Sequence, residues 1–168
     1  MKLINIEHPD NQEYYEIVKD IINSNEFQRR KEYKHHGTQS VYEHSLKISI
    51  ISYKLAKILG INYKNCAISG LLHDFYNNPW QDKNKKTTFL KMHGFVHASE
   101  ALQNSKKYFP QYMNKRIENT ILRHMFPLNI IPPKYIEGWI ITIVDKYVSM
   151  EIFNNPSKLL MYVGINQK

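Results

Sequence analysis

The amino-acid sequence predicts an all-α protein that folds as one domain. Three observations favour this fold class. Apolar residues recur at steps of three and four along several segments, which is the period of a helix with one buried face. Glycine and proline are sparse, and Gly60, Pro110 and Pro156 stand between those segments, where helices end. No segment alternates apolar and polar residues as a half-buried strand does.

Six helices are expected along the chain. They run near residues 10–23, 40–59, 63–75, 97–108, 111–124 and 134–154. The second is predicted from one apolar stripe, made of Val41, His44, Ile48, Ile51, Leu55 and Ile58. The third carries a similar group, made of Ala67, Ile68, Leu71, Leu72 and Phe75. On this third helix Ala67, Gly70 and Asp74 fall on one line, so the Asp74 carboxylate is expected on a face free of bulky side chains.

The last two helices place polar side chains among apolar ones. Ile117, Ile121 and His124 align at positions i, i+4 and i+7 of the fifth helix. In the sixth, Asp145 interrupts an otherwise strongly apolar run over residues 139–148. Several polar groups are therefore expected to point toward the packed interior.

These polar groups form the pattern H…HD…H…H…D, made of His44, His73, Asp74, His97, His124 and Asp145. Taken singly, His44 or His124 is better explained as a hydrogen-bonded core histidine. Asp145 alone is explained equally well by an ion pair with Lys146 or by a position at the helix edge. An unpaired ionised carboxylate in a core costs many kcal/mol, so it must become neutral, pair or bind a metal. One divalent metal centre explains all six residues together.

The pattern resembles the HD-domain superfamily of metal-dependent phosphohydrolases over residues 35–155, which implies a single-domain HD-type helical bundle. His44 matches the first histidine, His73 and Asp74 the doublet, and Asp145 the last aspartate of its single-metal core. His97 and His124 match the two further histidines of members with two metals, in which Asp74 would bridge the ions. The segments 40–46 and 93–97 also resemble a group of small bacterial HD proteins without an assigned substrate.

The fifth ligand is open between two histidines. His93 and His97 are four residues apart and both match that place in the pattern. We prefer His97, because the segment 98–102 after it reads as the start of a helix. His93 stands beside Gly94 and is expected in the preceding loop.

The resemblance implies hydrolysis of a phosphate ester or anhydride by metal-activated hydroxide, since a divalent ion lowers the pKa of bound water toward about 7. Two ions per chain are expected, iron or manganese, with cobalt, zinc, nickel or magnesium as alternatives. Asp74 is expected to act as the bridge. Lys47, Arg123 and Lys146 each lie near a proposed ligand in the sequence and are candidates to hold phosphate oxygens. For each of them the alternative is a solvated helix flank.

The expected substrate is a small anionic phosphorylated compound, with a nucleotide preferred. The segment 75–80 lacks the acidic pair of guanosine-tetraphosphate hydrolases, and the segment 125–128 lacks the Gly-Tyr-Pro signature of cyclic-di-GMP phosphodiesterases. Two other functions stay open. One is a di-iron oxygenase with the same ligand order, and the other is a non-catalytic regulatory module that binds metal or nucleotide.

Two loops are expected at the mouth of the site. Residues 76–86 follow the doublet and combine turn formers with a tryptophan and three lysines. Residues 126–133 follow His124 and contain too much proline for a helix. Residues 35–37, His-His-Gly, are a further candidate border of the site. For each segment an ordinary connector is the alternative.

Composition agrees with a compact cytoplasmic enzyme. The net charge of +8 suits an anionic substrate, but the lysines are scattered, so no nucleic-acid partner is expected. Cys66 is the only cysteine, which excludes an internal disulfide and suits a reducing compartment. We expect neither a signal peptide nor a membrane span. Within the single domain, residues 1–34 are expected to form a helical extension, 35–155 the metal-binding core and 156–168 a tail; the oligomeric state is open.

Overall fold

The computed structural model describes residues 8–33, 39–77 and 90–154, without the side chains of residues 90–95 and 151–154. Every regular element of these residues is a helix, which confirms the all-α prediction. The α-helices are α1 (Gln12–Ile22), α2 (Asn25–Gln28), α3 (Val41–Ile58), α4 (Tyr63–Leu72), α5 (Leu90–Tyr108), α6 (Lys115–Arg123) and α7 (Ile136–Asn154). Short 3₁₀ turns cover Pro9–Asn11, Arg29–Lys31 and Pro110–Tyr112.

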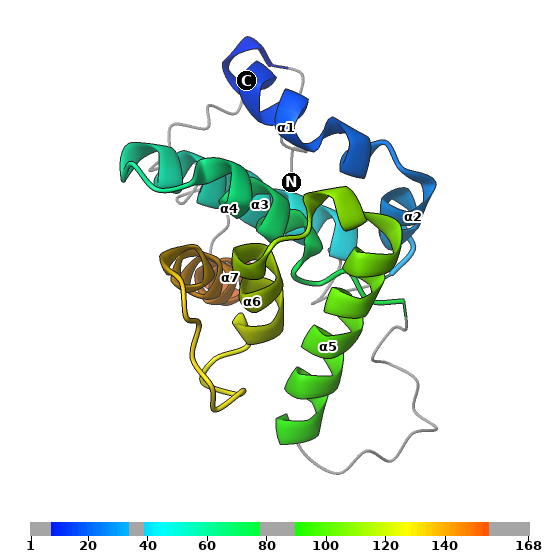
Figure 1. Cartoon of the computed structure of the whole chain (residues 1–168), viewed down its shortest axis with the longest axis vertical. Helices are drawn as coiled ribbons and strands as arrows, with labels where there is room; N and C mark the ends of the chain where they lie inside the picture. Colours follow the sequence, from blue (N-terminus) through cyan, green and yellow to red (C-terminus); the bar gives the residue numbers. More distant parts are fainter. Residues whose placement is uncertain (1–7, 34–38, 78–89, 155–168) are drawn as a thin grey trace.

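Helix α3 is the centre of the fold, with α1, α4 and α7 packed around it (Figure 1). Its side chains are therefore buried on nearly every face as far as Tyr53. A chain of buried hydrogen bonds joins three of these helices. The Tyr14 hydroxyl of α1 donates to Ser49 Oγ of α3 at 2.8 Å, and Ser49 Oγ donates to the Ala67 carbonyl of α4 at 2.5 Å.

Local signals set both ends of α3. Ser40 caps its N-terminus in a capping box, in which Ser40 Oγ accepts from the Glu43 N–H and the Glu43 carboxylate accepts from the Ser40 N–H. At the other end Gly60 adopts a left-handed φ of 67°. The N–H groups of Gly60 and Ile61 donate to the carbonyls of Lys57 and Ala56, which is a Schellman motif. The chain therefore reverses at once into α4.

The α3–α4 pair packs unusually closely at Gly70. A Cβ atom on Gly70 would lie 2.5 Å from the Cα and 2.8 Å from the backbone nitrogen of Ser49. The prediction that Gly70 clears space for the Asp74 carboxylate is therefore wrong. The space is filled by the backbone of α3, and the missing side chain instead allows the two helices to approach.

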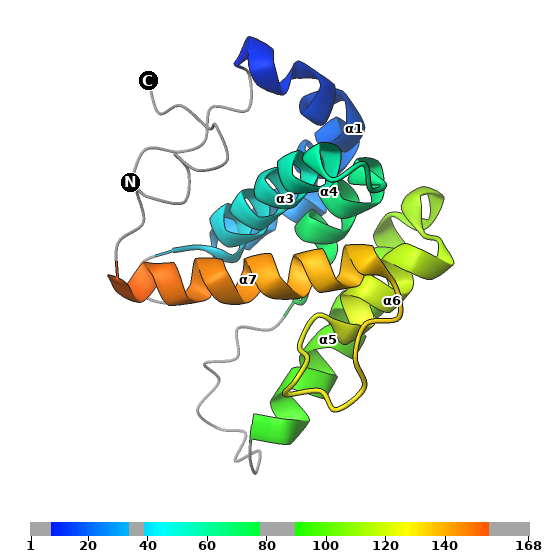
Figure 2. The ribbon, with the colours of Figure 1, turned by 90° about the vertical axis from the view of Figure 1, so that its left-hand side faces the viewer.

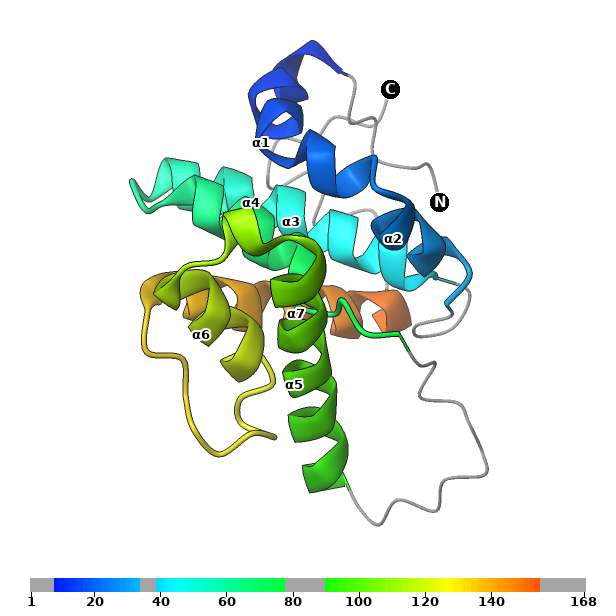
Figure 3. The same cartoon turned by 45° about the vertical axis from the view of Figure 1, so that its right-hand side comes forward.

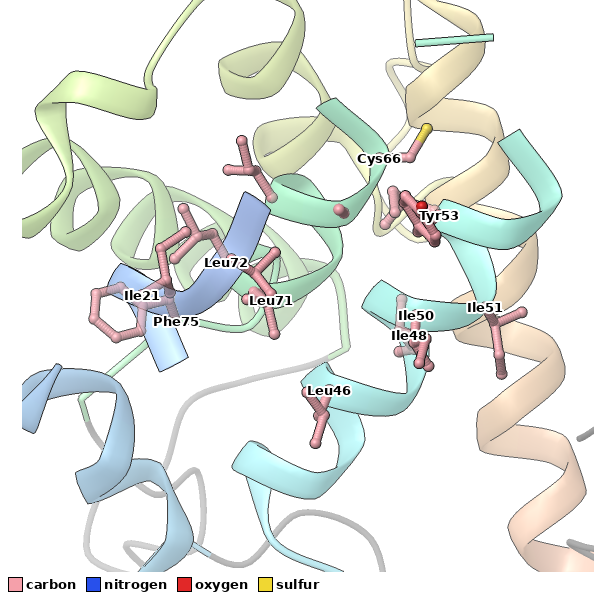
Figure 4. Close-up of a cluster of buried hydrophobic side chains, with 14 of the residues drawn as sticks. Ile21, Leu46, Ile48, Ile50, Ile51, Tyr53, Cys66, Leu71, Leu72 and Phe75 are labelled. Carbon is pink, nitrogen blue, oxygen red and sulfur yellow. The ribbon is translucent and has the colours of Figure 1, made fainter. Parts of the chain in front are cut away.

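The apolar core joins α1, α3 and α4 and continues to α6 and α7. Figure 4 shows the side chains of Ile21, Leu46, Ile48, Leu71, Leu72 and Phe75 within it. Cys66 belongs to the same cluster, and burial raises the pKa of its thiol to about 12. An un-ionised buried thiol is a poor nucleophile, which agrees with a packing role for Cys66.

Two helix boundaries differ from the prediction. Helix α5 begins at Leu90, seven residues before the expected start at His97, because a single glycine such as Gly94 weakens a helix by only about 1 kcal/mol and does not end it. Helix α4 ends at Leu72, so His73 and Asp74 lie in the turn that follows it. Ile58, expected on the buried stripe of α3, is 75% exposed at the end of that helix.

Helices α5, α6 and α7 complete the bundle on the side of α3 away from α1 (Figure 3). Helix α6 lies between α5 and α7 and contacts both. Across the described parts of the chain, no helix combines the length and apolar character that a membrane span requires.

Candidate metal centre

The structure brings the six predicted ligand residues together where five elements converge. Helix α3 supplies His44, the turn after α4 supplies His73 and Asp74, α5 supplies His97, the turn after α6 supplies His124, and α7 supplies Asp145. His44, His73 and His124 are fully buried, and their Nε2 atoms face the two carboxylates. Residues more than one hundred positions apart in the sequence thus share one small volume.

Asp74 lies between two pairs of histidines and presents one carboxylate oxygen to each. Its Oδ2 is 3.8 Å from His44 Nε2 and 3.5 Å from His73 Nε2. Its Oδ1 is 2.6 Å from His97 Nε2 and 3.4 Å from His124 Nε2. This arrangement suits a carboxylate that bridges two ions.

Asp145 completes the first of these two groups. Its Oδ1 is 3.1 Å from His44 Nε2 and 3.9 Å from His73 Nε2. Potential ligand atoms of His44, His73 and Asp145 all lie within 4.8 Å of one another, and the same holds for His73, Asp74 and His124. Both sets mix imidazole and carboxylate, which suits divalent transition metals.

Two of the histidines are held by the ends of the helices that precede them. His73 follows α4, and its Nδ1 is 2.8 Å from the Gly70 carbonyl; His124 follows α6, and its Nδ1 is 2.7 Å from the Ile121 carbonyl. These carbonyls belong to the last turn of each helix, where the helix itself provides no donor. Because a carbonyl can only accept, each Nδ1 must carry the proton, and the Nε2 of the neutral ring has a lone pair.

This lone pair is the best evidence that a metal fits. The Nε2 atoms of His73 and His124 are buried and make no hydrogen bond of good geometry, although carboxylate oxygens lie nearby. A buried polar atom left in this way is costly unless something binds it. A carbonyl bound to the far ring nitrogen is also the usual partner that orients a metal-ligating histidine.

The charge states also suit a cation. Burial lowers the pKa of His73 to about 4, so the ring is neutral at neutral pH. Burial opposes ionisation of both aspartates, but the surrounding histidines hold the pKa of Asp74 and of Asp145 below its usual value. Burial opposes protonation of His97 as well, yet the Asp74 carboxylate raises its pKa overall. Without a metal, a proton on His97 thus balances part of the negative charge that an ion would otherwise neutralise.

The comparison with known protein families agrees with this geometry. Residues 41–150 match the HD domain, which is more than half of the chain. The chain belongs to the HD domain family. The resemblance seen in the sequence is thus confirmed, and the family is a superfamily of metal-dependent phosphohydrolases. A comparison with curated proteins found no match.

In this HD domain His93 and His97 lie on the same helix. The expectation that His93 precedes the helix is wrong, because α5 already begins at Leu90. His97 is the residue whose ring meets Asp74, at 2.6 Å. The side chain of His93 lies outside the described residues.

We predict that His97→Ala removes one of two bound metal equivalents and that His93→Ala removes none. His97 contacts the Asp74 oxygen that faces His124, so its loss leaves the other group of ligands intact. Metal content per chain, measured by plasma mass spectrometry for both variants, checks this. Loss of metal from the His93 variant, with full retention in the His97 variant, would reverse the assignment.

The three candidate phosphate-binding cations occupy different settings in the HD domain. Lys146 is half-buried, and its Nζ donates to the His124 carbonyl at 3.4 Å. Burial lowers its pKa, opposed by Asp145 and Asp74. Lys47 is only 2% exposed, so a solvated flank is wrong for this residue. Arg123 is half-buried beside His124.

Sequence reasoning missed the contacts that hold the segment after the doublet. The Arg30 guanidinium, almost fully buried, lies 3.9 Å from the centre of the Phe75 ring and donates to Asn77 Oδ1 at 2.7 Å. The Phe75 carbonyl accepts from Asn104 Nδ2 at 3.0 Å. Arg30 lies outside the matched residues, and its sequence offers no signal of this role, because an arginine in a polar segment is usually exposed.

Tyr76 forms a wall of the HD centre that was predicted only as part of a loop. Its ring centroid is 4.2 Å from that of His97, and the side chain is 1% exposed. Of the predicted mouth loops, residues 78–86 and 35–37 lie outside the described residues. Residues 126–133 are free of helix, as expected.

Proposed function

We propose that this HD domain protein is a metal-dependent phosphohydrolase that cleaves a phosphate ester or anhydride of a nucleotide or another small phosphorylated metabolite. The observation that carries the proposal is the position of Asp74, with one oxygen toward His44 and His73 and the other toward His97 and His124. Asp145 adds a second carboxylate to the first group. Six ligands divided in this way suit two divalent ions, with iron or manganese preferred.

The side chains of the chain itself prepare the site for such ions. His44, His73, Asp145 and one Asp74 oxygen would hold the first ion; His97, His124 and the other Asp74 oxygen would hold the second. When bound, divalent ions supply Lewis-acid activation of water and of a phosphoryl oxygen. The Gly70 and Ile121 carbonyls keep two of the imidazoles in the orientation required for ligation.

Lys146 is the best placed of the three cations to bind the phosphate group. Its ammonium is fixed at the His124 carbonyl, at the edge of the ligand set, and it is half-exposed, so an incoming anion can reach it. A cation held in place before the substrate arrives stabilises negative charge on phosphoryl oxygens without reorganisation. The net charge of +8 supports attraction of an anionic substrate over a longer range.

The test is a panel of nucleotides and other phosphate esters, assayed with the iron-loaded and the manganese-loaded protein. We expect release of phosphate or of a phosphorylated product from at least one nucleotide, and none from Asp74→Asn treated in the same way. Oxygen consumption without hydrolysis would replace the proposal with a di-iron oxygenase. A metal-loaded protein that is inactive in both assays would favour a regulatory module.

A further inference from the structure

Helix α7 exposes its apolar side chains and buries its polar ones. Between residues 136 and 150, the exposed side chains are all apolar: Ile136, Trp139, Ile143, Tyr147 and Met150, each 36–66% exposed. Glu137, Thr142 and Asp145 of the same helix are buried. A helix that is apolar on all sides is expected to be covered on all sides. We call these five exposed side chains the α7 face.

The α7 face is a narrow strip along the outside of the bundle. In Figure 2, α7 crosses in front of α3 and α4 with no described element in front of it. At 3.6 residues per turn, the five side chains lie within about 40° of the direction of Ile143. The loop before α7 borders the face, since the rings of Phe126 and Trp139 are 5.4 Å apart. That loop exposes three further apolar residues, Leu128, Ile130 and Ile131.

We propose that the α7 face pairs with the same face of a second copy of this chain, so that the protein is a homodimer. The spacing of the face is symmetric about Ile143, because Trp139 and Tyr147 lie four residues on either side of it. Ile136 and Met150 lie seven residues on either side. When two such helices pack antiparallel about a two-fold axis, Ile143 meets its own copy and every other member meets its counterpart.

The apolar area is sufficient for a dimer. If a fully exposed large side chain presents about 200 Å², in the range that buried aromatic residues remove from water, the α7 face presents roughly 500 Å². Two copies would then bury about 1,000 Å², the lower bound for a specific interface, before the three loop residues are added. The face contains tryptophan, tyrosine and methionine and no charged side chain, which is typical of the centre of an interface.

Charge makes a distinctive contribution to this association. Each copy has a net charge of +8, and the α7 face has no opposite charge that would attract its partner. Salt screens the repulsion between the two copies and leaves the apolar contact in place. We therefore expect the dimer to become tighter as the salt concentration rises.

The test is the mass of the full chain in solution, measured by analytical ultracentrifugation over a wide concentration range. We expect a dimer whose dissociation constant rises about 100-fold or more in Ile143→Lys, because the change places two ammonium groups at the axis. Ile58→Lys is the matched control, since Ile58 is 75% exposed at the end of α3 and outside the α7 face. Wild-type protein that stays monomeric, or an Ile143 variant as dimeric as the Ile58 variant, would overturn the proposal.

A second pair of variants tests the position of the axis without adding charge. Ile143→Cys should form a disulfide-linked dimer under mild oxidation, because the new thiol faces its own copy, whereas Ile58→Cys should not. The native Cys66 does not interfere, since it is buried. Equal cross-linking of the two variants would refute an axis at Ile143.

Discussion

Replacing Asp74 with alanine is expected to remove both ions from the metal centre and to abolish hydrolysis. Asp74 is the only carboxylate in contact with both groups of histidines among the described residues. Its loss removes a ligand from each proposed ion and leaves the buried histidines with less negative charge to balance a cation. Loss of a mere orienting partner of a ligand typically costs about 10–100-fold in metal affinity, so loss of a shared ligand should cost more than roughly 100-fold.

Metal content and phosphatase activity of the same preparation check this result. Asp10→Ala is the control, because Asp10 is an exposed carboxylate that contacts only His8 and Asp10's own backbone in its region of the described chain. It should retain the metal and the activity of the wild type. An Asp74 variant that keeps two equivalents of metal would show that the carboxylate does not bridge them.

Gly70→Ala is expected to destabilise the fold by about 2 kcal/mol, because overpacking costs roughly 1–3 kcal/mol and here the obstacle is backbone. The added Cβ would lie 2.5 Å from the Ser49 Cα, so α3 and α4 must move apart. The better helix propensity of alanine offsets only about 1 kcal/mol. The same movement separates His44 on α3 from His73 after α4, so metal affinity should fall as well.

Urea unfolding of the metal-free protein measures the first effect, and the midpoint should fall with an unchanged slope. Lys64→Ala is the matched control, since Lys64 is exposed on the same helix and its loss should leave the midpoint nearly unchanged. A Gly70 variant as stable as this control would mean that α3 and α4 have room for a side chain at that position.

The helices could be predicted because their signals are local. The apolar period, the Ser40 cap and Gly60 lie within a few residues of the boundaries they determine. The start of α5 was placed too late because glycine and histidine resemble a loop in sequence, while packing keeps the segment helical. The purpose of Gly70 was misread because only the position of Ser49, on another helix, reveals it.

The residues that converge on the site were also predictable, because an unpaired carboxylate in an apolar helix calls for a partner. Their mutual arrangement was not. The division of the histidines between the two oxygens of Asp74 depends on how five elements meet, which no local pattern specifies. Arg30 and Tyr76 were missed for the same reason, since their roles come from contacts with Phe75 and His97.

Metal content per chain tests the binuclear centre most directly. Plasma mass spectrometry should be done on protein purified without chelators or a histidine tag, and again after reconstitution with iron or manganese. The arrangement around Asp74 predicts two equivalents, bound by His44, His73, Asp74, His97, His124 and Asp145. One equivalent would leave His97 and His124 as supporting residues, and no metal after reconstitution would contradict the metal centre and the hydrolytic function with it.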